Sequence, residues 1–261
     1  VLTLADEDAT KELIKKGERS ADEAQYLQYL SRYFGEPEGT NGPVYVGALI
    51  CALFLLGCVV VRGPLRWALV VLTVLSVLLA LGRNCMWLTN LMIDYMPMYS
   101  KFRTVESILV IAEFTMPLLA VMALQQVLCT GDASEAWKQY RKPVLWSFGI
   151  VLGLCLVGII FPQLYGSLIS ENDRAMDAQF AQYLLSQGAD AQLVQMFSLN
   201  NPRIYAAVES VRSGMVESDA MRSFMIAGAG FGLLLLYFFK KLNVGVVAVL
   251  TGVVVCGDLF M

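Results

Sequence analysis

The chain has 261 residues, of which 57% are hydrophobic and 16% charged, and its net charge is −3. This composition is too apolar for a soluble domain of this length, and the weak negative charge argues against nucleic acid, which requires clustered basic surface. His is absent, so the chain lacks the commonest zinc ligand and the usual neutral-pH general base, and its six Cys suggest no disulfide framework. We therefore expect an integral membrane protein.

The first 43 residues precede the long apolar stretches. Residues 6–34 place apolar side chains at three-to-four spacing opposite a highly charged face, which predicts an amphipathic helix. The run EPEGTNGP then ends this helix. We expect the helix to lie on the outer surface of the membrane, in preference to forming a cofactor site.

Six apolar stretches follow, each close to the roughly 20 residues that cross a bilayer. Lys and Arg lie between the first and second stretches, the third and fourth, and the fifth and sixth, which places these loops in the cytoplasm by the positive-inside rule. Both ends of the chain, residues 83–104 and residues 163–222 then lie outside. The predicted spans are 44–61, 65–82, 105–128, 144–162, 223–239 and 242–258.

The predicted fold is an all-α, polytopic transmembrane helix bundle of about six spans with extracytoplasmic helical segments. Its parts are an outer amphipathic helix and loop (1–43), four transmembrane helices with an outer interfacial segment at 83–104 (44–162), an outer helical segment (163–222) and two transmembrane helices (223–261).

The long outer segment contains signals for helix ends. Gly188 breaks a helical pattern whose apolar face includes Phe180. Asn201 is a good N-cap and Pro202 suits the first turn, so we expect a helix that continues from there into the fifth span. Glycines in that span permit close helix packing: Gly228, Gly230 and Gly232.

A charged stripe enters the third span. Arg103 and Glu106 are three residues apart, and Glu106 and Glu113 are seven apart, so on an α-helix all three share one face. Placing a charged side chain inside a span costs about 2.5–3.5 kcal/mol. The stripe could line a cavity in which Lys101 and Arg103 bind a phosphate and the carboxylates position a hydroxyl or hold a divalent cation. It could equally be an Arg103–Glu106 ion pair, with Glu113 hydrogen-bonded to a neighbouring helix. With Arg83, another outer cation, these residues are the candidate substrate-binding set.

Other polar residues have local interpretations. Pro117 is expected to kink the third span near Glu113. The aromatic and Met-rich stretch before the span indicates a membrane-surface anchor rather than a ligand groove. Arg222 and Asp219 are expected to form a local ion pair, and Asp258 to reach the outer interface as a helix-end residue rather than to relay protons.

Four blocks resemble a known family. They are RYFGEPEGTNGPVYVGALICALFLLG (Arg32 to Gly57), LLALGRN (Leu78 to Asn84), DYMPMYSKFRTVESILVIAEFTMPLLA (Asp94 to Ala120) and VESDAMRS (Val216 to Ser223). In their order and content they resemble the bacterial YfhO family of membrane proteins. After Phe102-Arg103 the chain reads TVES, where many relatives have a Pro-Ser-Arg-like run.

The resemblance implies a GT-C-like glycosyltransferase of the bacterial inner (cytoplasmic) membrane. Such a protein transfers sugar from a polyprenyl-phosphate donor to a cell-envelope acceptor outside the cytoplasm. In GT-C enzymes the catalytic carboxylate lies in the first outer loop, which we expect upstream of Val1, so no catalytic residue is assigned here. The chain is then a segment of a larger protein, with no cofactor implied beyond a possible divalent cation.

Two other classes of function remain open. A transporter or flippase of a lipid-linked or envelope component would also use membrane acids and a proline-kinked helix, and would show paired broken helices in two halves. A non-catalytic membrane scaffold subunit would use its outer helices for docking. An acidic first outer loop upstream would favour the enzyme.

Overall fold

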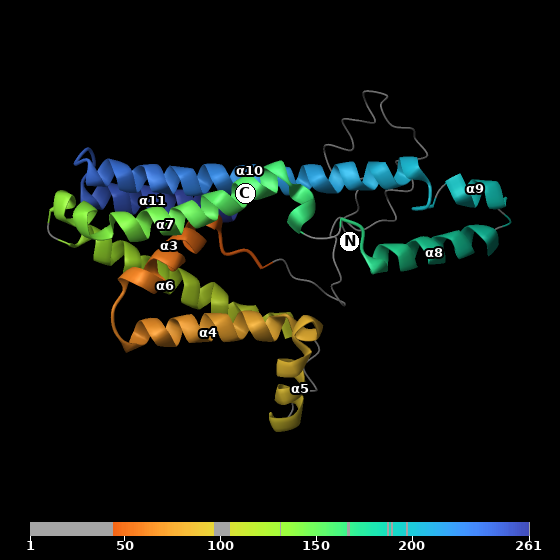
Figure 1. Ribbon diagram of the computed structural model, residues 1–261, viewed down its shortest axis with the longest axis horizontal. Coiled ribbons are helices and arrows are strands. Elements are labelled where there is room, and N and C mark those ends of the chain that lie inside the picture. The colour runs from red at the N-terminus through yellow and green to blue at the C-terminus, as the bar shows by residue number, and fades with distance from the viewer. Residues whose placement is uncertain are drawn as a thin grey trace. The chain divides into compact units, whose positions relative to one another are not determined.

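The computed structural model describes residues 44–96, 105–130, 132–165, 168–186, 188, 190–196 and 198–260 (Figure 1). Every element in these ranges is helical, which confirms the predicted all-α class. The helix predicted at 6–34 lies outside the described residues. The elements are α3 (Ala48–Val60), α4 (Pro64–Ala80), η2 (Gly82–Cys85), α5 (Met86–Tyr95), η4 (Val105–Leu109), α6 (Val110–Leu128), α7 (Ala133–Ile160), η5 (Pro162–Tyr165), α8 (Glu171–Ser186), α9 (Ala191–Met196), α10 (Pro202–Phe238) and α11 (Val244–Phe260), where η denotes a 3-10 helix.

The chain divides into two compact units. Unit 1 comprises Val1–Pro37 and Val157–Ala220, and unit 2 comprises Glu38–Leu156 and Met221–Met261. The long helices α7 and α10 contribute residues to both units. Each unit has its own hydrophobic cluster and its own buried polar contacts, so each is described by itself below.

Within the described residues, three helical stretches are long and apolar enough to cross a membrane: Ser107–Leu128, Ala133–Ile160 and Pro202–Phe238. The helices α3, α4 and α11 are apolar but shorter. The 13 residues of α3 span about 20 Å at 1.5 Å per residue, less than the ~30 Å hydrocarbon core. Its predicted start at residue 44 is four residues too early, because Gly47 has a φ of +96° and stands outside the helix as its N-cap.

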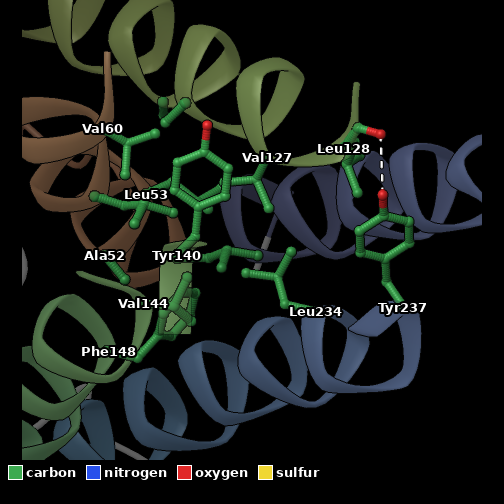
Figure 2. Packing of buried hydrophobic residues seen from close by; sticks show 14 of the residues in the cluster. Ala52, Leu53, Val60, Val127, Leu128, Tyr140, Val144, Phe148, Leu234 and Tyr237 are labelled. Carbon is green, nitrogen blue, oxygen red and sulfur yellow. Dashed lines mark hydrogen bonds between the residues drawn. The ribbon is translucent and has the colours of Figure 1, made fainter. Parts of the chain in front are cut away.

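Unit 2 is organised around the packing of α3 on α6 (Figure 2). Gly57 permits the close approach, since a Cβ there would lie 2.7 Å from Cγ of Leu119 and 2.8 Å from its carbonyl oxygen. Gly230 plays the same part toward Leu49 of α3, whose side chain occupies the place of a Cβ. Gly228 and Gly232 were also predicted to allow close packing. A Cβ added at either position would meet no atom within 4 Å, so no helix approaches closely there among the described residues.

Polar contacts join several helix ends at one end of unit 2, which we call the Lys240 end. The Tyr237 hydroxyl donates to the carbonyl oxygen of Leu128 over 3.0 Å (Figure 2). The Lys240 ammonium lies 2.6 Å from a carboxylate oxygen of Asp132. The ends of α6 and α10 and the residue before α7 therefore meet at this end.

Unit 1 confirms the predicted helix signals. The side-chain oxygen of Asn201 accepts the N–H of Arg203 over 3.0 Å, and α10 runs unbroken from Pro202 into unit 2. Gly188, with a φ of +84°, follows the end of α8. The apolar cluster of this unit is formed by Leu199, Ile204, Val208 and Val211, with Ile169, Phe180 and Met215 packed against it.

Candidate functional site

The candidate site on α6 is positioned by a hydrogen bond to α4. The hydroxyls of Thr73 and Thr115 lie 2.6 Å apart, and both residues are buried. Each hydroxyl also lies 2.8 Å from the carbonyl oxygen four residues earlier in its own helix. Because threonine satisfies its hydroxyl in this way, both side chains are accommodated among apolar neighbours.

This contact sets the depth of Glu113. Thr73 is the tenth of the 17 residues of α4, so it lies near the middle of that helix. Glu113 precedes Thr115 by two residues, which is about 3 Å along the α6 axis. It therefore lies at the level of the apolar middle of α4. Its side chain is nevertheless exposed on the surface of unit 2, and no hydrogen bond or ion pair joins it to another described residue.

The backbone at Glu113 adds a second polar group. Pro117 lies inside α6, four residues later, and has no N–H with which to bond the Glu113 carbonyl. A carboxylate and a carbonyl oxygen that lacks its usual helical donor thus lie at one position of a largely apolar helix. Hydrogen-bond acceptors at such a depth require a donor from a neighbour, a ligand or water.

The other predicted site residues are placed only in part. Glu106 lies in the 3-10 helix η4 and not in α6, so part of the segment between it and Glu113 is 3-10 rather than α-helical. A 3-10 helix turns by about 120° per residue and an α-helix by about 100°, so the two positions stay within about 40° of each other around the helix axis, on roughly one face. Arg83 lies in η2. The side chains of Glu106 and Arg83, and all of Lys101 and Arg103, lie outside the described residues.

A second polar cluster in unit 2 was missed by sequence reasoning. The Tyr45 hydroxyl donates to Oδ1 of Asp258 over 2.7 Å, and Nη2 of Arg222 lies 3.4 Å from the same oxygen. The guanidinium also stands over the Tyr45 ring, 5.3 Å from its centroid. Oδ2 of Asp258 lies 2.8 Å from where a Cβ of Gly47 would be, so a glycine is needed there.

This cluster corrects the expectation for Arg222. Its ion-pair partner is Asp258, 36 residues away, and not Asp219 one turn earlier in the same helix. The Asp258 side chain is only 2% exposed, so it is packed inside and does not reach outward to an interface. The predicted topology could have indicated this cluster. It places the three residues at the outer ends of the first, fifth and sixth spans, one residue at each end.

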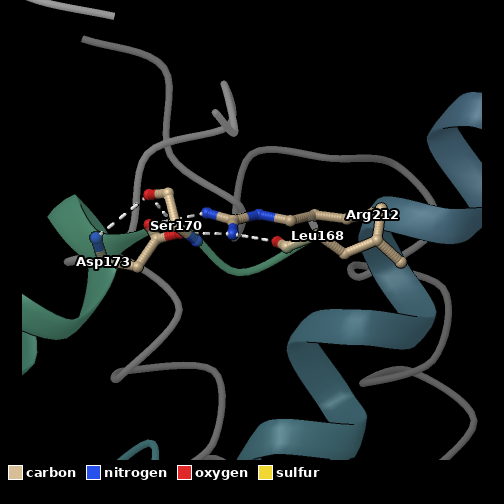
Figure 3. Close-up of polar contacts among 4 residues, drawn as sticks. All are labelled: Leu168, Ser170, Asp173 and Arg212. Carbon is tan, nitrogen blue, oxygen red and sulfur yellow. Dashed lines mark hydrogen bonds and ion pairs between the residues drawn. The ribbon is translucent and has the colours of Figure 1, made fainter. Parts of the chain in front are cut away.

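Unit 1 contains a more deeply buried pair (Figure 3). Nη1 of Arg212 lies 2.6 Å from Oδ2 of Asp173, and Nη2 lies 2.9 Å from Oδ1. The guanidinium also donates to the carbonyl oxygen of Leu168. Both charged side chains are nearly inaccessible, with 0% and 3% exposure. This bidentate arrangement fixes the first turn of α8 against α10.

Asp173 also completes the start of α8. Its carboxylate accepts the backbone N–H of Ser170 over 2.8 Å, while the Ser170 hydroxyl accepts the N–H of Asp173 over 3.2 Å. This is the reciprocal capping box, and the spacing Ser170-Glu-Asn-Asp173 was readable in the sequence. Burial acts to raise the pKa of Asp173, but the hydrogen bonds from Arg212 and Ser170 and the charge of Arg212 outweigh it and lower the pKa below its ordinary value.

Comparisons with known proteins add no relative, since no protein-family model, curated protein or solved structure matches the chain. Among the described residues, no three Cys, Asp or Glu side chains gather to hold a metal ion. The chemistry of the site must therefore be argued from Glu113 and its surroundings.

Proposed function

We propose that this chain contributes about six spans to a larger protein of the bacterial cytoplasmic membrane that transfers a sugar from a polyprenyl-phosphate donor to a cell-envelope acceptor outside the cytoplasm. The membrane character rests on three long apolar helices. The reaction rests on the four sequence blocks that resemble the YfhO family, and the place of the site rests on Glu113.

The exposed carboxylate of Glu113 is the observation that carries the proposal. An ionised side chain inside a span costs about 2.5–3.5 kcal/mol on insertion scales, so it is expected to face a polar ligand, a partner or a water-filled space. In the predicted topology the span that contains Glu113 enters the membrane from the outer side. A substrate hydroxyl would therefore reach Glu113 through a water-filled space that opens outward.

Sugar transfer requires two kinds of group. A base must accept the proton of the acceptor hydroxyl, and positive charge must stabilise the phosphate that leaves the donor. We assign the second task to Lys101, Arg103 and Arg83. Glu106 and Glu113 would position the acceptor hydroxyl. The base itself is expected in the upstream outer loop of the full-length protein.

The test is transfer of radiolabelled sugar from polyprenyl-phosphate donors by the purified full-length protein. We expect Glu113→Gln and Arg103→Ala to lower kcat/KM by about tenfold or more, because a misplaced hydroxyl or an unneutralised phosphate raises the barrier. Glu135→Gln is the matched control, since Glu135 is an exposed acid near the Lys240 end. Full activity of the Glu113 and Arg103 variants would assign the stripe a structural role. Absence of transfer by the wild type with every donor would refute the proposal.

Transport or flipping of a lipid-linked component is the second candidate. Pro117 and the released carbonyl of Glu113 favour it, because interrupted helices line transporter binding sites. Proteoliposomes separate the two functions: a transporter would move labelled polyprenyl-phosphate sugar between leaflets without an acceptor, and Glu113→Gln would slow this. A scaffold subunit would show neither activity.

The six spans have a separate test. Cys introduced at Gly63 and Asn243, in the α3–α4 and α10–α11 turns, would stay protected from an impermeant thiol reagent in intact cells and react after lysis. A Cys at Asp190 in unit 1 would react from outside. Labelling of Gly63→Cys in intact cells would overturn the predicted orientation.

A further inference from the structure

A shallow groove lies along the surface of α7 in unit 2. It has a volume of about 420 Å³, within the ~300–1,000 Å³ range of ligand pockets. Its lining consists of Leu145, Trp146, Gly149 and Ile150. Gly149 forms the gap, because no atom lies within 4 Å of the place where its Cβ would be. The groove is thus an apolar surface depression produced by one missing side chain.

The groove faces away from the core of unit 2. Val144, Phe148 and Val151 on the opposite side of α7 are buried in the hydrophobic cluster. The three groove side chains are between 48% and 72% exposed. Because this part of α7 belongs to a helix long and apolar enough to cross a membrane, the groove is expected to open toward the lipid.

Two cations lie on the same face, closer to the start of the helix. Arg141 and Lys142 are exposed, and each precedes a lining residue, Leu145 or Trp146, by four positions. At 1.5 Å per residue they lie about 10–12 Å along the axis from Gly149. The indole of Trp146 lies between the charges and the gap. A phospholipid has its parts in the same order: the cations would contact its headgroup, the tryptophan its interfacial region and the groove its acyl chain.

We propose that this face of α7 binds one anionic phospholipid, with the lipid phosphate on Arg141 and Lys142 and one acyl chain in the groove at Gly149. The positive charge selects an anionic over a zwitterionic headgroup. The apolar groove selects a lipid over a soluble phosphate, since only a lipid carries a chain to fill it. The site lies on α7, whereas the proposed sugar transfer is assigned to α6, so each proposal can fail without the other.

The charge is tested by native mass spectrometry of the purified full-length protein titrated with phosphatidylglycerol or phosphatidylcholine. We expect the wild type to prefer phosphatidylglycerol. The double variant R141Q/K142Q should lose about 30-fold in affinity for it and little for phosphatidylcholine. The control R62Q/K241Q removes the same charge from exposed loop positions outside α7 and should change neither affinity. Equal loss in both double variants, or no preference in the wild type, would overturn the proposal.

The groove is tested by Gly149→Leu. The Cβ of the new side chain meets no atom within 4 Å, so we expect the protein to fold, with leucine occupying the depression. It should then bind both lipids at least fivefold more weakly, as expected for losing contacts along part of one chain. Gly252→Leu in α11 is the matched control, since that glycine is also exposed with no atom within 4 Å of its Cβ place. Glycerol phosphate, which has no acyl chain, should not displace phosphatidylglycerol. Displacement by it, or unchanged binding to Gly149→Leu, would contradict the inference.

Discussion

An Arg–Asp pair occurs in each unit, and the two pairs differ in both geometry and burial. In unit 1, Arg212 and Asp173 make two contacts of 2.6 and 2.9 Å, with both side chains nearly inaccessible. In unit 2, Arg222 reaches Asp258 through one 3.4 Å contact and is 32% exposed. The residue types and the sequence separations are nearly the same, yet only the first arginine has a fully buried side chain.

The difference concerns what each cation depends on. The Arg212 side chain is inaccessible to solvent, so its charge is stabilised by the Asp173 carboxylate and the Leu168 carbonyl oxygen. Arg222 keeps access to its surroundings and stacks on Tyr45, so its charge has other partners available. A buried ion pair is weak evidence for stability, but removing one partner from it is strongly destabilising. The two pairs should therefore respond differently to the same kind of substitution.

The largest effect is expected for Asp173→Ala. It leaves the Arg212 guanidinium buried without its anion and also removes the capping box of α8, at a cost of about 3–5 kcal/mol. The thermal unfolding midpoint of the purified protein, together with proteolysis within residues 168–186, would measure this loss. The double substitution Asp173→Leu with Arg212→Met removes both charges and should lose less. Equal losses in the two variants would show that uncompensated charge is not the cause.

Acid should weaken the same contact by a smaller amount. The folded pKa of Asp173 lies below the ordinary value for an Asp carboxyl, so its contribution to stability is fully present above that ordinary value and is lost as pH falls through the folded pKa. Unfolding midpoints should therefore fall more steeply below about pH 4 for the wild type than for Asp173→Asn, which cannot titrate at this position. Parallel pH profiles for the two proteins would contradict the assignment.

The smallest effects are expected in unit 2, and they should be unequal. Arg222→Gln leaves a carboxylate that is 2% exposed without its cation, which should cost about 1–3 kcal/mol. Asp258→Asn leaves an accessible arginine and keeps an acceptor for Tyr45, so it should cost less than about 1 kcal/mol. Unfolding midpoints of the two variants give the comparison. A larger loss for Asp258→Asn would mean that Arg222 depends on Asp258 as Arg212 does on Asp173.

Local sequence signals predicted much of the fold. Hydrophobic stretches located the apolar helices, and Asn201 with Pro202 marked the start of a helix that does continue into the fifth predicted span. The capping box at Ser170 and Asp173 was equally readable. The start of α3 was misplaced because hydropathy does not register the positive φ of Gly47 or the Asp258 carboxylate packed beside it.

Long-range pairing could not be predicted in the same way. Arg222 was assigned to Asp219 because spacing along a helix identifies only neighbours in that helix, whereas its partner comes from α11. Arg212 and Asp173 are 39 residues apart, and no periodicity connects them. For Glu113, the sequence predicted a charge within a span, but its level relative to α4 depends on the contact between Thr73 and Thr115.

That contact also determines the register of α4 along α6. Apolar side chains pack almost equally well after a slide of one helical turn, about 5.4 Å, whereas a hydroxyl pair matches at one position only. Each threonine has a single proton, so while one donates to its own helix the other donates across. Such interhelical bonds contribute about 0.6 kcal/mol on average in a membrane protein. One modest hydrogen bond thus selects the alignment of two helices and with it the level at which the Glu113 carboxylate is presented.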